Sequence, residues 1–254
     1  MRPALVALSS AVPLVVCCSA FSADGPASGS DAGAGEGAAG DAAPSDASSV
    51  RDAGDGLDAA PLKDCVTHTL DFETTGYSSP WVGSVGLVRT TEAPHGGAAA
   101  GRVNSKLPAY VQAELADGRT HVDVDYWIRI ATVAAYAEVG CLTYFHGGSS
   151  TLSLFLSYDG SAYNLVADKA GTTLKTQSFT SLTAGYVHAT TRLDLIGTTL
   201  HYESTFGDVK LSGSADVGSF VAEVAGVRCG LTFADAQGSV SADIDDIRLR
   251  ACRR

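Results

Sequence analysis

One ten-residue run constrains the fold of this chain more than any other segment. Between residues 121 and 130 the side chains alternate between apolar and polar. The apolar set is Val122, Val124, Tyr126, Ile128 and Ile130, and the polar set is His121, Asp123, Asp125, Trp127 and Arg129. A period of two places the two sets on opposite faces of a β-strand. The run therefore predicts a strand with one face in a core and the other directed to solvent or a ligand.

Similar strand patterns recur through residues 63–254. They are separated by turn residues at roughly 8–12-residue spacing, and no stretch of the sequence has sustained helical spacing. The Asp159-Gly160 pair is typical of a two-residue hairpin turn, which would place Leu156 opposite Tyr163. These patterns predict an all-β fold, a two-sheet antiparallel sandwich of roughly a dozen strands.

The first eighteen residues follow the pattern of a bacterial export signal. Arg2 precedes an apolar stretch, residues 4–16, that is too short to cross about 30 Å of hydrocarbon as a helix. The stretch ends in two cysteines and resembles a lipobox, in which Cys18 would receive a diacylglycerol. This interpretation predicts an outer-membrane or cell-surface lipoprotein whose only membrane contact is its lipid. The alternative is cleavage after Ala20 or Ser22, which predicts a secreted or periplasmic protein.

Residues 19–62 are predicted to form a disordered linker between this leader and a domain at residues 63–254. The linker is rich in Ala, Gly, Asp and Ser, and its few larger apolar side chains cannot offset the entropy of ordering. Its eight acidic residues against Arg51 give a net charge of −7, which with the leader leaves −5 of the total −11 for the domain. An acidic domain without a run of Lys and Arg argues against nucleic acid as a partner.

Four cysteines lie in the domain, and their number is even. In an exported domain this predicts two disulfides, which allow three pairings. We favour Cys65–Cys252 with Cys141–Cys229, because Cys65 opens the first strand pattern and Cys252 closes the last. The sequence has no C-x-x-C and no histidine pair at ligand spacing, which argues against zinc.

Five segments form a pattern through their residues at strand ends and their spacing along the chain. They are LDFE at 70–73, DYWIRI at 125–130, LSYDG at 156–160, RLDL at 192–195 and IDDIRL at 244–249. Together they resemble the concanavalin A-like lectin/glucanase jelly roll, a superfamily that includes laminin G-type modules. The resemblance covers most of residues 65–252. It implies a two-sheet sandwich with paired first and last strands, often a structural calcium ion, and commonly a glycan site on the concave face or in rim loops.

Four carboxylates are candidate calcium ligands. If Cys65 and Cys252 join neighbouring antiparallel strands, Asp71 lies opposite Asp246. Glu73 and Asp245 are then close by. Oxygen ligands that converge from two strands suit Ca²⁺, so these residues predict a structural calcium site. Alternatively, the acids are solvated at strand ends, and residues 243–246 mark a β-bulge.

Trp127 lies on the polar side of its strand, between Asp125 and Arg129. This set suits sugar recognition, because an indole stacks on the apolar face of a pyranose while charged side chains bind its hydroxyl groups. Alternatively, a loop covers Trp127 and the residue serves packing. Further ligand-binding candidates at loops or strand ends are Trp81, Tyr144 and His146.

Catalytic motifs of the superfamily are missing from the sequence. Its glucanases have Glu-x-Asp-x-Glu and its lyases Gln-x-His, whereas the nearest run here, at residues 123–125, lacks the glutamates. We therefore predict a tethered, non-catalytic module that binds glycans or envelope polysaccharide, with no prediction of its oligomeric state. The alternatives are a jelly-roll glycoside hydrolase or polysaccharide lyase, and an adhesion module that binds another protein.

Overall fold

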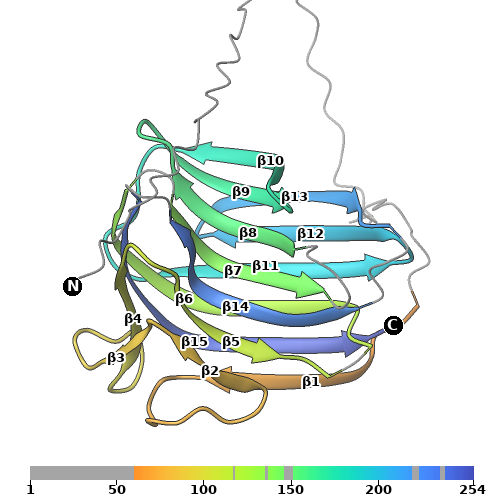
Figure 1. The fold of residues 1–254 in the computed structure, drawn as a ribbon, viewed down its shortest axis with the longest axis horizontal. Coiled ribbons are helices and arrows are strands. Elements are labelled where there is room, and N and C mark those ends of the chain that lie inside the picture. Colours follow the sequence, from red (N-terminus) through yellow and green to blue (C-terminus); the bar gives the residue numbers. More distant parts are fainter. Residues whose placement is uncertain (1–59, 117, 135–136, 146–150, 219–222, 235–237) are drawn as a thin grey trace, which may run out of the picture. The chain divides into compact units, whose positions relative to one another are not determined.

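The computed structural model describes residues 60–254 except 117, 135–136, 146–150, 219–222 and 235–237. These residues form two antiparallel sheets, here called sheet A and sheet B, packed face to face (Figure 1). The predicted fold class, an all-β two-sheet sandwich of jelly-roll type, is confirmed. Within the described ranges, no helix has the length and apolar character needed to cross a bilayer. The predicted leader, Cys18 and nearly all of the predicted linker lie outside the described residues.

Sheet A has eight strands in the order β13-β12-β11-β6-β15-β4-β3, with β1 also paired to β15. Their bounds are β1 Lys63–Leu70, β3 Val88–Thr90, β4 Ala100–Ser105, β6 His121–Val133, β11 Val187–Ile196, β12 Thr199–Phe206, β13 Val209–Asp216 and β15 Val240–Arg253. Sheet B has seven strands in the order β10-β9-β8-β7-β14-β5-β2. Their bounds are β2 Trp81–Val85, β5 Ala109–Glu114, β7 Ala137–Phe145, β8 Thr151–Tyr158, β9 Tyr163–Lys169, β10 Thr172–Phe179 and β14 Val224–Ala234.

The last strand, β15, connects three neighbours in sheet A. One edge pairs with β6 along most of its length, while the other pairs first with β4 and then with β1. The change of partner coincides with a register shift between Asp245 and Arg248, where Asp246 has a φ of 49°. The alternative that residues 243–246 mark a bulge is therefore confirmed.

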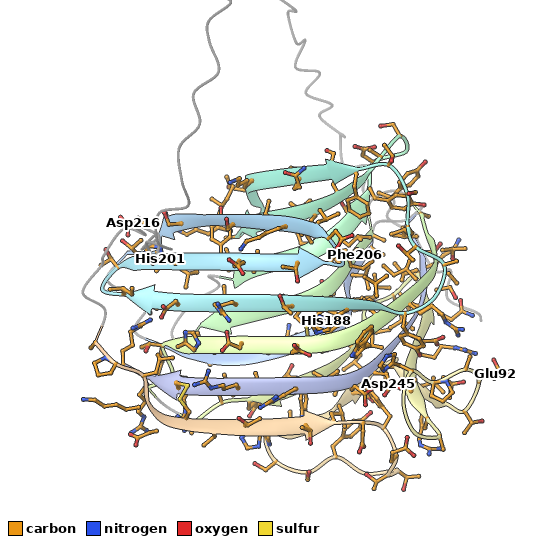
Figure 2. The ribbon with its side chains drawn as sticks, turned by 180° about the vertical axis from the view of Figure 1, so that it is seen from behind. Glu92, His188, His201, Phe206, Asp216 and Asp245 are labelled. Atoms are coloured by element: carbon orange, nitrogen blue, oxygen red, sulfur yellow. A yellow bond between two sulfur atoms is a disulfide. The ribbon has the colours of Figure 1, made fainter. Side chains whose placement is uncertain are left out.

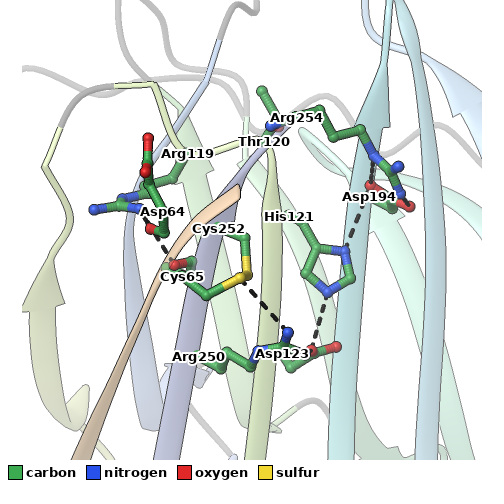
Figure 3. Close-up of a disulfide and its surroundings, with 11 residues drawn as sticks. Asp64, Cys65, Arg119, Thr120, His121, Asp123, Asp194, Arg250, Cys252 and Arg254 are labelled. Atoms are coloured by element: carbon green, nitrogen blue, oxygen red, sulfur yellow. Dashed lines mark hydrogen bonds and ion pairs between the residues drawn. A yellow bond between two sulfur atoms is a disulfide. The ribbon is translucent and has the colours of Figure 1, made fainter. Parts of the chain in front are cut away.

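Both favoured disulfides are present. Cys65–Cys252 joins β1 to β15, and Cys141–Cys229 joins β7 to β14. The first and last strands of the domain thus lie side by side, as the resemblance implied. Figure 3 shows the first bridge next to His121, which lies opposite Cys252 in the register of β6 and β15.

The inward-facing side chains of both sheets form one core. Strand β6 contributes its whole apolar set to this core: Val122, Val124, Tyr126, Ile128 and Ile130. Each of these side chains is at most 8% exposed, which removes enough apolar surface from water to stabilise the fold by roughly 1.5–3 kcal/mol per side chain. The alternation predicted for this strand is confirmed, and it places the polar set on the outer face of sheet A.

The β8–β9 hairpin differs from its predicted register. Leu156 lies opposite Leu165 rather than Tyr163, because a loop at residues 159–162 replaces the two-residue turn. Asp159 Oδ1 accepts the backbone N–H groups of residues 161 and 162, each at 2.9 Å. These hydrogen bonds hold the pKa of the Asp159 carboxyl well below its usual range. The register moves by two residues, so the same side chains still face the core.

Candidate functional site

Cross-strand register assembles charged side chains on the outer face of sheet A. One row contains Arg250, Asp123, Arg192 and Glu203, each directly opposite the next, from β15, β6, β11 and β12. The signs of these four charges alternate along the row. Opposite charges that face each other across antiparallel strands stabilise the sheet. The row therefore brings together residues from distant parts of the sequence.

A second row lies beside the first. It contains Arg248, Asp125, Thr190, Thr205 and Lys210, and the next pair along β6 and β11 is Trp127 opposite His188. We define the polar strip as these outer-face residues: Asp123, Asp125, Trp127, His188, Thr190, Arg192, Glu203, Arg248 and Arg250. Figure 2 views this face of the sandwich and labels His188 on β11 and His201 on β12.

Three adjoining hollows run across the strip. The central hollow has a volume of about 280 Å³ and shares Asp125 and Arg248 with a hollow of about 400 Å³ beside Trp127. It shares Arg192 and Glu203 with a third hollow of about 380 Å³. The three hollows reach from β1 to β13, or about 24 Å at the usual strand spacing. An extended ligand of several units fits this dimension.

Trp127 forms one wall of the 400 Å³ hollow. The imidazole of His95, from the β3–β4 loop, stacks on the indole with ring centroids 4.0 Å apart and an interplanar angle of 13°. His188 approaches at 5.1 Å with a tilt of 42°. A loop residue thus packs on Trp127, in line with the alternative from the sequence, while Trp127 still lines the hollow with Asp125 and Arg248.

Arg129 has a different environment from Trp127 and Asp125, with which it was predicted to bind a ligand. Its guanidinium binds the buried carboxylate of Asp243, which Arg102 also binds at 2.7 Å through Nε. The same guanidinium lies 5.5 Å from the ring centroid of Tyr186, a cation–π distance. These contacts give Arg129 a structural role in neutralising Asp243. Of the predicted trio, Trp127 and Asp125 line the strip and Arg129 does not.

Arg248 and Arg192 line the strip but were not among the predicted site residues. Arg248 and Arg250 alternate with Ile247 and Leu249, so the sequence holds a signal that both arginines face outward. Nothing in the sequence aligns β15 with β6 and β11, however. Only the register of these strands places the arginines beside Asp123 and Asp125.

Asp123 is the centre of a charged network at one end of the strip (Figure 3). Its carboxylate lies 2.9 Å from Nε2 of His121 and accepts a hydrogen bond of 2.7 Å from Nε of Arg192. Burial alone would raise the pKa of Asp123, but these two hydrogen bonds outweigh it and lower the pKa to about 2. Asp123 therefore remains a carboxylate at neutral pH and serves to hold the Arg192 guanidinium.

The network predicts a pH dependence of stability. The pKa of Asp123 in the folded protein lies below its ordinary value of 3.8. The contribution of Asp123 to folding stability is therefore present above about pH 4 and is lost as the pH falls toward about 2. We expect Asp123→Asn to lower the free energy of unfolding by about 2 kcal/mol at pH 6, and by far less near pH 2. Urea unfolding at stepped pH measures this difference, with Asp208→Asn in an exposed turn as the control. A difference that stays constant with pH would contradict the assignment.

The same fold occurs in solved structures. The "Cellulose induced protein, Cip1" matches with a TM-score of 0.53 at 15% identity, over 72% of this chain and 96% of that one. The "Xyloglucan PUL GH43B" of Bacteroides ovatus matches with a TM-score of 0.50 at 14% identity, over 73% of this chain. A xylan beta-1,4-xylosidase from Bacillus halodurans C-125 matches with a TM-score of 0.50 at 13% identity, over 71% of this chain. The match covers only 38% of each of the latter two proteins. Neither a family model nor a curated protein matches the sequence.

The predicted calcium ligands all have contacts with protein groups. Asp245 is fully buried, and its carboxylate accepts backbone N–H groups of residues 95, 96 and 246 at 2.8–3.3 Å. Asp246 lies 2.8 Å from Nδ1 of His95. These contacts fix the loop that places His95 on Trp127.

Glu73 and Asp71 are engaged in the same way. Glu73 Oε1 accepts the N–H groups of residues 98 and 99 at 2.8 and 3.1 Å, and Asp71 Oδ1 accepts that of Glu73 at 3.1 Å. Across the described ranges, no three His, Cys, Asp or Glu side chains are grouped to hold a metal. A calcium shell needs six to eight oxygens, and the calcium site stays a prediction from the resemblance.

The other predicted ligand residues lie elsewhere. Trp81 is the first residue of β2 and is 3% exposed within the core, so the expectation of a rim residue is corrected. Its ring is large and apolar, and the sandwich buries it between the sheets. Tyr144 lies in β7, but its side chain is outside the described part of the structure, as is the whole of His146.

Proposed function

We propose that this protein is a non-catalytic carbohydrate-binding module that holds a glycan along the polar strip. The observation that supports this most directly is the hollow beside Trp127, where an indole, the Asp125 carboxylate and the Arg248 guanidinium meet. An aromatic face with charged hydrogen-bonding groups beside it suits a sugar ring. The names of the three similar structures refer to cellulose, xyloglucan and xylan, which is compatible with this class of ligand.

The carboxylates of the strip favour binding over hydrolysis. A hydrolase requires one carboxyl group that holds a proton near neutral pH and a second that is ionised within reach. Asp123 has its pKa lowered to about 2, Asp125 lies 2.9 Å from His188, and Glu203 lies 2.7 Å from Lys210. Asp123 is thus ionised, and the other two acids contact neighbouring side chains of sheet A, an arrangement that suits binding better than hydrolysis.

The hydrolase alternative rests on a different residue. Burial, with a further contribution from Asp168, raises the pKa of Glu138 to about 7. Glu138 lies on β7 of sheet B, so it is on the other sheet from the polar strip. Release of reducing sugar from a polysaccharide, abolished by Glu138→Gln and retained in Trp127→Ala, would favour this alternative.

A glycan-array screen of the full chain, with Ca²⁺ and with chelator, tests the proposed function. We expect at least one glycan to bind, and Trp127→Ala to weaken that binding by roughly tenfold or more, because stacking on the indole is lost. Titration calorimetry on the best array ligand measures the change. The chelator arm tests the predicted calcium ion at the same time.

The control variant is Tyr77→Ala. Tyr77 is also a partly exposed aromatic residue, but it lies between β1 and β2 and does not line the strip hollows. Its replacement should leave glycan binding unchanged. Equal affinity of the Trp127→Ala and Tyr77→Ala variants, or the absence of any array ligand, would overturn the proposal.

A further inference from the structure

The central hollow of the polar strip is lined by three guanidinium groups and three carboxylates, but these do not form three pairs with one another. The side chain of Arg248 is exposed, and no side-chain hydrogen bond or ion pair joins its guanidinium to another described residue. Arg192 is 60% exposed and donates from Nε to Asp123, which leaves its two Nη groups without a partner among the described residues. The nearest carboxylate oxygen to Arg250 is 3.5 Å away, on Asp123. Arginine donors from β11 and β15 are therefore available in one hollow.

The acids around this hollow already have partners. Asp123 is bound by His121 and Arg192, Asp125 by His188, and Glu203 by Lys210. Asp125 lies directly opposite Arg248 in the register of β6 and β15, yet its side-chain contact is to His188. The donors of Arg248 and Arg192 are thus left to water or to an anionic group of a ligand.

The fork of a guanidinium matches a carboxylate, which it binds with two parallel hydrogen bonds. The neighbouring acids and the net charge of −5 on residues 63–254 repel a ligand with dense negative charge. Arg248 also lines the adjoining hollow with Trp127, so a sugar ring on the indole can present a carboxylate to this arginine. These facts favour a ligand that carries a single carboxylate on an otherwise neutral glycan.

We propose that the polar strip recognises glycans with isolated uronate residues. The sugar ring lies against Trp127, and its carboxylate binds Arg248 with support from Arg192. This inference rests on the proposed function and narrows it to a class of ligand. A neutral glycan of the same backbone leaves the two guanidinium groups unsatisfied and binds less well.

Matched ligand pairs test this inference on the full chain. One pair is xylotetraose with a single glucuronate branch and its methyl ester, and the other is a hyaluronan tetrasaccharide and its methyl ester. In titration calorimetry we expect the acid of at least one pair to bind about tenfold more tightly than its ester, since the ester removes the charge but keeps the shape. Dextran sulfate serves as the dense polyanion and should bind more weakly than that acid.

Variants then assign the effect to Arg248. Arg248→Gln should reduce the preference for the acid to about twofold or less, while Arg248→Lys should keep part of it as a point charge. Both variants should fold, because the Arg248 side chain is exposed and has no side-chain partner in the described structure. The matched control is Lys106→Gln, which removes one positive charge from the exposed turn between β4 and β5.

The outcomes separate the two proposals. If neutral glycans bind with dependence on Trp127 and the acids bind no better, the inference fails while the proposed function stands. If no glycan binds, both fail. Binding of dextran sulfate as tightly as the acid, unchanged in Arg248→Gln, would indicate general attraction of anions and overturn the inference.

Discussion

Replacing Cys65 and Cys252 together by alanine should lower the free energy of unfolding by about 5 kcal/mol. The two cysteines are 187 residues apart, so in the chain-entropy model their bridge removes a large amount of conformational freedom from the unfolded chain. A loss of this size is comparable with the whole stability of a typical domain, about 5–15 kcal/mol. Guanidinium chloride unfolding of the full chain, followed by tryptophan fluorescence, measures it.

The second disulfide provides the comparison. Cys141 and Cys229 are 88 residues apart, about half the separation, so loop entropy alone predicts an effect only about 0.6 kcal/mol smaller. Both of these cysteines are buried, and their replacement also leaves unfilled space in the core. An unfolding midpoint unchanged by loss of Cys65–Cys252 would mean that pairing of β1 with β15 alone holds the two ends of the domain. The loop-entropy argument would then fail.

The features that could be predicted from the sequence depend on local periodicity. Alternation along residues 121–130 identified a strand and its two faces, and both were correct. The cysteine pairing was also predictable, because Cys65 and Cys252 lie at the ends of a domain whose first and last strands adjoin. In the first case the information lies in the spacing of residues within one strand, and in the second it lies in the positions of two cysteines at the two ends of the domain.

The remaining features depend on contacts between distant segments. Arg248 lies in the site because of the register between β15 and β6, and no local sequence pattern predicts that register. His95 covers one face of Trp127 because Asp245 binds the loop backbone, a contact across 150 residues. The β8–β9 register was missed because the Asp159 side chain accepts loop N–H groups and lengthens the turn. Side-chain hydrogen bonds of this kind compete with the turn that the dipeptide alone predicts.

Gly230→Ala should destabilise the domain by at least about 3 kcal/mol. Gly230 lies in β14 with a φ of 140°, a backbone conformation that residues with a Cβ rarely adopt. An added Cβ would lie 2.3 Å from the carbonyl oxygen of Ala109 and 2.7 Å from the Cα of Tyr110. Both atoms belong to the backbone of β5, which cannot withdraw without breaking its pairing with β14. Thermal unfolding measures the loss.

Two other glycines separate the causes of this expected loss. Gly197 has a φ of 61° with no atom within 4 Å of an added Cβ, so Gly197→Ala reports backbone strain alone, about 1–2 kcal/mol. Gly76 has neither feature, and Gly76→Ala should be close to neutral. If Gly230→Ala costs no more than Gly197→Ala, then β5 and β14 separate freely and the close approach is not a constraint.

The Gly230→Ala variant also tests on which sheet the ligand binds. Gly230 belongs to sheet B, whereas the polar strip lies on the outer face of sheet A. The fraction of Gly230→Ala protein that remains folded should therefore bind glycan with the affinity of the unaltered protein. Calorimetry at a temperature well below the unfolding midpoint gives both the affinity and the fraction of active sites. A change in affinity, as opposed to a smaller active fraction, would place ligand contacts on sheet B and contradict the location of the site.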